Sequence, residues 1–118
     1  MSAMLLENLG EDLRSQVLAT RWLGFLLQYV DHENLKKLLD YYHRIGWISS
    51  EVKEKLINLA EGIKSGGSKN EWTLPHRVHL TSLLFIQRLS GENREGELAG
   101  LSTYIRDYIE SPEEFLSV

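Results

Sequence analysis

The sequence predicts an all-α protein, a compact bundle of four to five helices with short connections and one flexible loop. Apolar residues recur at helical spacing along most of the chain, and no stretch alternates between apolar and polar residues long enough to indicate a strand. The chain has 118 residues, of which 42% are hydrophobic and 25% charged, as is typical of globular proteins. We therefore expect residues 1–118 to form a single helical domain with one hydrophobic core.

The first helix contains the most apolar part of the chain. Residues 1–11 precede it as an N-terminal segment that we expect to be flexible. From Val17 to Val30 most positions are apolar or aromatic, and the others fall on one narrow side: Thr20, Arg21, Gly24 and Gln28. A helix that is apolar over so wide an arc is buried either by its own domain or by a partner. Trp22 and Phe25 are thus core residues of a central helix or anchors for another protein.

The next two helices each carry an apolar stripe between recognisable ends. The stripe of the second helix consists of Leu35, Leu38, Leu39, Tyr42 and Ile45, and that of the third of Val52, Leu56, Leu59, Ala60 and Ile63. Asp31 is expected to cap the second helix, and Ser49 or Ser50 the third.

The stretch DYYHRIGWISSEV, residues 40–52, joins these two helices. If Gly46 adopts the left-handed conformation, a Schellman ending places Trp47 against Tyr42, and Ile48 enters the core. We therefore interpret the stretch as a structural corner between helices.

Beyond the third helix, residues 62–72 are rich in glycine, serine and lysine, which predicts an exposed flexible loop. The helix that follows has Pro75 in its first turn and Gly91 just beyond its end. Residues 92–118 are expected to form a C-terminal amphipathic helix and a short turn, with Ser111 as the cap of that turn.

No pattern in the sequence indicates catalytic, cofactor-binding or metal-binding residues. The chain has no cysteine, which excludes disulfides and zinc–thiolate sites. His76 and His79 share a helical face in HRVH, but zinc needs three or four ligands, and His32 or His43 contributes only if the fold brings it near.

Ser49 or Ser50, with His43 and Asp40, suggests a hydrolase triad, but the serines are better explained as helix caps, and no G-x-S-x-G turn frames them.

Charge and hydropathy limit the partners. A net charge of −4 argues against general nucleic-acid affinity. The corner invites a small helix-turn-helix DNA-binding regulator as the alternative function, but the lysines of the helix after it are matched by glutamates. The longest uncharged apolar stretch, WLGFLLQYV, is too short to cross a bilayer, which takes about 20 residues. The shortness of this stretch predicts no direct membrane insertion, and the absence of cysteine fits a reducing, cytoplasmic location.

Three ordered pieces, RWLGFLLQYVDHENLKKLLDYYHRIGWISSEV, LAEGI and HLTSLLFIQRLSG, resemble the conserved domain of the FlaD/FlaE family of archaellum accessory proteins. The resemblance covers residues 13–91 and includes the family's tryptophan-containing first helix and its IGWIS-EV junction. The chain looks like a FlaE-type protein or the C-terminal domain of FlaD.

The resemblance implies a non-enzymatic cytosolic scaffold or adaptor of the archaellum motor, part of the switch complex that links chemotaxis to motility. It implies FlaC, FlaH and the chemotaxis adaptor CheF as protein partners, a location at the cytosolic base of the archaellum and no cofactor, and it is compatible with an oligomer. For partner binding we single out aromatic residues of the first and the C-terminal helix: Trp22, Phe25, Tyr104 and Tyr108. A metal-dependent enzyme stays open as a third class.

Overall fold

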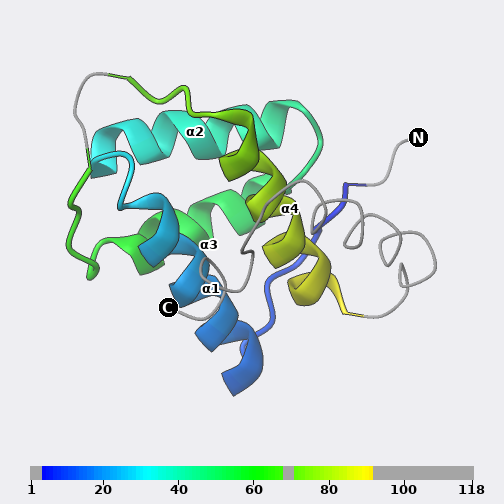
Figure 1. The fold of residues 1–118 in the computed structure, drawn as a ribbon. Helices are drawn as coiled ribbons and strands as arrows, with labels where there is room; N and C mark the ends of the chain where they lie inside the picture. The colour runs from blue at the N-terminus through cyan, green and yellow to red at the C-terminus, as the bar shows by residue number, and fades with distance from the viewer. Residues whose placement is uncertain (1–3, 68–70, 92–118) are drawn as a thin grey trace.

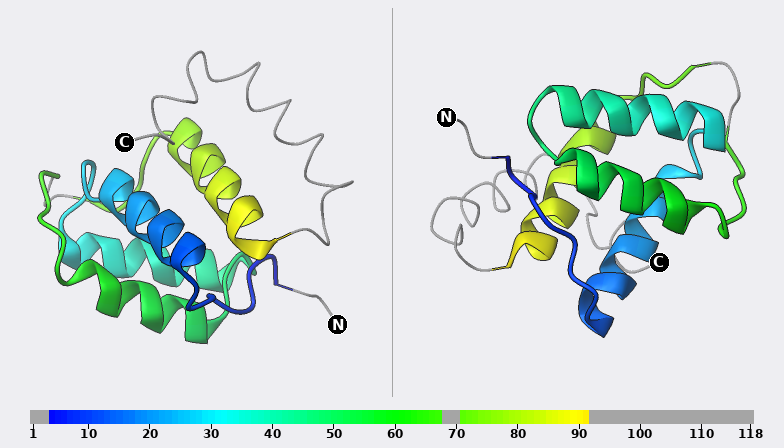
Figure 2. Two further views of the ribbon diagram at one scale, coloured as in Figure 1. Left: turned by 90° about the horizontal axis from the view of Figure 1, so that it is seen from below. Right: turned by 180° about the vertical axis from the view of Figure 1, so that it is seen from behind.

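Four helices form two layers in the computed structural model, which describes residues 4–67 and 71–91. α1 (Leu13–Leu26) and α4 (His76–Ser90) lie side by side in one layer, while α2 (His32–Arg44) and α3 (Ser50–Ala60) form a hairpin in the other (Figures 1 and 2). Within the described ranges there is no strand, and Leu6 and Ile48 form an isolated bridge. The all-α prediction is therefore confirmed. The helix predicted in 92–118 lies outside the described residues.

The helix starts follow local sequence signals. The Asp31 carboxylate accepts a hydrogen bond from the backbone N–H of Asn34 at 2.9 Å, and the Ser49 hydroxyl accepts one from Val52 at 3.1 Å. Both caps were expected, and of the two serines considered, Ser49 is the cap. Pro75 lies one residue before α4 rather than in its first turn.

α1 ends four residues earlier than the apolar run suggested, at Leu26 rather than at Val30. The chain then turns, so that the carbonyl groups of Leu27 and Val30 face the loop after α3. The Ser65 hydroxyl donates to the Val30 carbonyl at 3.0 Å, and the backbone N–H of Gly66 donates to the Leu27 carbonyl at 2.9 Å. The apolar residues of the turn are buried by tertiary packing although they have left the helix.

The loop predicted at 62–72 is therefore only partly as expected. Several of its described residues are exposed, but residues 65–67 are fixed to the turn after α1. Gly67 lies so close to the backbone of Tyr29 and Val30 that a Cβ atom at this position would overlap it. Only glycine allows this approach without a shift of the backbone.

The described part of the N-terminal segment, residues 4–11, differs from the prediction of a flexible stretch at 1–11. Leu6 and Leu9 are buried in the core. The segment crosses the corner between α2 and α3 (Figure 2, right) and makes three backbone hydrogen bonds there: Leu5 N–H to the Gly46 carbonyl (3.2 Å), Leu6 N–H to Trp47 (3.0 Å) and Ser49 N–H to Leu6 (3.1 Å). The corner leaves backbone groups outside any helix, and the segment satisfies them.

Candidate functional site

The corner at Gly46 has the predicted geometry. Gly46 has a φ of 86°, and the backbone N–H groups of Trp47 and Gly46 donate to the carbonyls of Tyr42 (2.9 Å) and His43 (3.1 Å). These two bonds define a Schellman ending. The rings of Trp47 and Tyr42 stack with centroids 5.0 Å apart, and Ile48 is fully buried. The interpretation as a structural corner is confirmed.

The three residues considered as a hydrolase triad each bond elsewhere. The Ser49 hydroxyl donates to the Glu7 carbonyl at 2.8 Å, and His43 Nδ1 lies 3.0 Å from the Ile48 carbonyl. Asp40 accepts from Arg44 and Lys53, and these hydrogen bonds hold the pKa of its carboxylate below the usual value. The geometry therefore gives the serine no base to activate it.

The four histidines do not converge either. His32 Nε2 lies 3.0 Å from the Ala60 carbonyl, and His79 Nδ1 lies 2.9 Å from the Tyr42 hydroxyl, whereas His76 is exposed at the start of α4. In the part of the chain that the structure describes, no three metal-ligating side chains form a group.

Trp22 and Phe25, singled out above for partner binding, lie in the core with 0% and 1% of their surface exposed. The Trp22 ring lies between those of Tyr42 and Phe85, at centroid distances of 6.4 and 6.2 Å. Its indole N–H donates to the Ser82 hydroxyl at 2.9 Å. This burial corresponds to the alternative in which the domain itself covers the first helix, and it leaves neither ring exposed to a partner. Tyr104 and Tyr108 lie outside the described residues.

A buried polar chain connects α1, α2 and α4. The Tyr42 hydroxyl lies 3.0 Å from Ser82 Oγ and 2.9 Å from His79 Nδ1. Because the hydroxyl has a single proton, it donates to one of these two groups and accepts a hydrogen bond from the other. Burial raises the pKa of Tyr42. Burial, with a smaller contribution from His76, lowers the pKa of His79. Both groups are therefore neutral at pH 7, and the chain of bonds holds helices together.

The sequence analysis missed Ser82. Nothing about a serine in SLLFI marks it as the acceptor for a tryptophan on another helix. The available signal was physical: a buried indole N–H requires an acceptor, and α4 offers few candidates on its apolar face.

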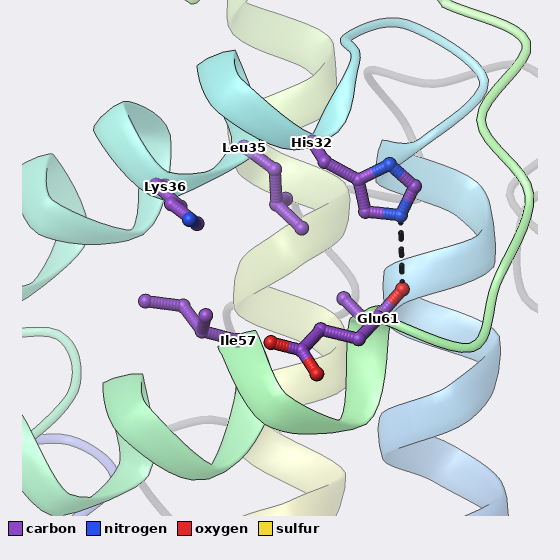
Figure 3. A pocket seen from close by; sticks show the side chains of 6 residues that line it. His32, Leu35, Lys36, Ile57 and Glu61 are labelled. Carbon is purple, nitrogen blue, oxygen red and sulfur yellow. Dashed lines mark hydrogen bonds between the residues drawn. The ribbon is translucent and has the colours of Figure 1, made fainter.

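A small hollow opens at one end of the α2–α3 hairpin (Figure 3). Its volume is about 190 Å³, and its lining consists of His32, Leu35, Lys36, Ile57, Ala60 and Glu61. Figure 3 shows Leu35 and Lys36 projecting from α2 toward Ile57, with Glu61 at the end of α3. Lys36 also lines a second hollow, together with Lys37, Asp40, Arg44 and Trp72.

The lysines of α3 are paired with carboxylates. Lys53 contacts Asp40 at 3.4 Å, and Lys55 contacts Glu51 at 3.5 Å and Glu11 at 4.0 Å. A recognition helix contacts DNA phosphates and bases with unpaired cations. The pairing in α3 therefore does not favour the helix-turn-helix alternative.

Residues 1–91 match the sequence model described as "Archaeal flagella protein". The chain belongs to this family. Among relatives, flagella-related protein E of Methanococcus voltae is 32% identical over 117 residues, covering 96% of this chain and 87% of that protein. Flagella-related protein D of the same organism is 36% identical over 90 residues, covering 73% of this chain and 25% of that protein.

Membership in the archaeal flagella family confirms the resemblance to FlaD and FlaE and indicates a role in motility. Flagella-related protein E of Methanocaldococcus jannaschii is 35% identical over 95 residues, covering 75% of this chain and 65% of that protein. No solved structure matches this chain. In the described ranges, no helix has the length and hydrophobicity needed to cross a membrane.

Proposed function

We propose that this chain is a non-enzymatic scaffold or adaptor of the archaeal flagellum motor, part of a switch complex that links chemotaxis signals to motility through protein–protein contacts. The observation that carries the proposal is the way its sequence recurs. It matches 87% of one family member and 25% of another from the same organism. A domain that occurs both nearly alone and as a fraction of a longer chain is typical of a module that connects other proteins.

The side-chain chemistry supports this role. The polar residues that attract attention in the sequence hold the fold together: Ser49 caps a helix, His43 bonds the backbone of the corner, and Tyr42 joins α2 to α4 through Ser82 and His79. A rigid helical domain of this kind presents its outer helix faces to partners.

The proposed partners are FlaC, FlaH and CheF, and the proposed location is the cytoplasmic base of the archaellum. The test mixes the purified full chain with each of these proteins and measures binding by calorimetry and the mass of the complex by light scattering. We expect a stoichiometric complex with FlaC or FlaH. Absence of a complex with all three, at protein concentrations of about 50 μM, would contradict the proposal.

The contribution of the C-terminal tyrosines is tested in the same assay. If Tyr104 and Tyr108 are anchors, the double variant Tyr104→Ala/Tyr108→Ala or deletion of residues 93–118 weakens FlaC binding at least about tenfold. Unchanged affinity in both variants would remove these tyrosines from the interface while leaving the adaptor role in place.

A further inference from the structure

We propose that the outer surface of α2, together with the hollow between α2 and α3, binds an acidic protein segment that inserts one apolar side chain. We call this surface the α2 face and define it by Leu35, Lys36, Lys37, Ile57 and Ala60. The inference deepens the proposed adaptor function and rests on it, because it assigns a surface and a class of partner to that role.

The size of the hollow points to a side chain rather than a small molecule. Its volume of about 190 Å³ lies below the roughly 300–1,000 Å³ of ligand pockets. Ile57 is only partly buried, and Leu35 and Ala60 close the floor beneath it. An apolar depression that holds one anchor residue is a common centre of a protein interface.

The charges beside the hollow select an acidic partner. Lys36 and Lys37 are exposed, and among the described residues neither makes an ion pair. Arg44, farther along the same helix, is already paired with Asp40 at 3.3 Å. Two exposed lysines beside an apolar depression are complementary to carboxylates that flank an apolar residue.

Polyanions such as nucleic acid fit the α2 face less well. Asp40 lies between the lysines and Arg44 and would repel a continuous line of phosphates. Glu61 lies at the edge of the hollow, at the end of α3. Its carboxylate would repel a negative charge on the bound segment there, so that end of the segment should carry a basic or neutral residue.

The test uses a synthetic peptide of about 12 residues, with glutamates on both sides of one central leucine, as the probe. It is titrated into the isotopically labelled full chain, and the amide signals are followed by NMR. We expect shifts concentrated in residues 32–37 and 57–61. Replacing the central leucine of the peptide by serine should weaken binding about tenfold, and raising the salt from about 50 to about 300 mM should weaken it further.

Variants of the chain complete the experiment. The double variant Lys36→Gln/Lys37→Gln should weaken peptide binding about fivefold to tenfold. The matched control, Arg77→Gln/Arg88→Gln, removes two exposed cations from α4 and should change it less than about twofold. Circular dichroism confirms that each variant is folded.

Three results would overturn the α2 face: no shifts with the peptide, shifts elsewhere on the chain, or equal binding of the leucine and serine peptides. Equal binding of a DNA oligonucleotide of the same charge would also overturn it, in favour of unspecific polyanion binding. The titration needs no motor protein, so its failure leaves the adaptor role to the FlaC and FlaH measurements. Failure of those measurements, with the peptide still bound, would instead remove the motor role.

Discussion

Replacing Ser82 by alanine tests whether the buried polar chain between α1, α2 and α4 stabilises the fold. Ser82 is fully buried, and its hydroxyl accepts the indole N–H of Trp22 at 2.9 Å. Ser82→Ala removes this acceptor. Trp22 has no exposed surface, so water cannot replace the lost bond. The Tyr42 hydroxyl, in contrast, keeps His79 as a partner at 2.9 Å.

The expected loss follows from these contacts. A buried donor without an acceptor costs about 1–3 kcal/mol, and alanine returns a few tenths of a kcal/mol through its higher helix propensity. The free energy of unfolding should therefore fall by about 1–2.5 kcal/mol. In a domain of this size, each kcal/mol lowers Tm by about 4–8 °C.

The assay is urea unfolding followed by circular dichroism, with linear extrapolation to water. Ser90→Ala is the matched control, because Ser90 lies in the same helix and, among the described residues, its hydroxyl bonds only the nearby Gln87 carbonyl, at 2.9 Å. We expect that control to stay within about 0.5 kcal/mol of the wild type. If Ser82→Ala is no more destabilising than Ser90→Ala, the indole bond does not stabilise the fold and the reasoning is wrong.

Three further predictions use the same unfolding assay. Gly67→Ala should lower the free energy of unfolding by about 2–3 kcal/mol, because the added Cβ meets the backbone of the turn after α1. Gly66→Ala has open space around it and should change the free energy of unfolding by less than about 0.5 kcal/mol. Equal effects of the two variants would contradict the close approach. Gly46→Ala should cost about 1–2 kcal/mol because alanine is strained at a φ of 86°, and a neutral result would show that the corner relaxes. The pKa of His79 is lowered on folding from its ordinary value of 6.5, so the unfolded chain binds the proton more readily and the free energy of unfolding should fall as the pH drops below 6.5. His79→Gln should reduce this loss of stability between pH 7.5 and 5.5, whereas His76→Gln should keep it. The reverse order would refute the argument.

The helices and their ends could be predicted because their signals are local. Asp31 and Ser49 cap the backbone three residues ahead, and Gly46 ends α2 through hydrogen bonds that reach back five residues or fewer along the chain. The predicted stacking of Trp47 on Tyr42 follows from the same ending. Periodicity also predicted a buried first helix, but it could not show whether the domain or a partner covers Trp22.

Contacts between distant residues decided the rest. The bond from Trp22 to Ser82 joins positions 60 residues apart. Leu6 bonds the backbone of Trp47 and Ser49, which follow it only after α1 and α2. Neither contact depends on a pattern within one segment. The hollow beside Lys36 likewise exists only because α3 lies against α2 at a particular register.

By itself, the sequence determined where this chain is helical and which family it resembles, because backbone capping and apolar periodicity act over a few residues. Only the tertiary structure decided which aromatic rings are buried and which surface is left for a partner, because burial depends on how all the helices pack at once.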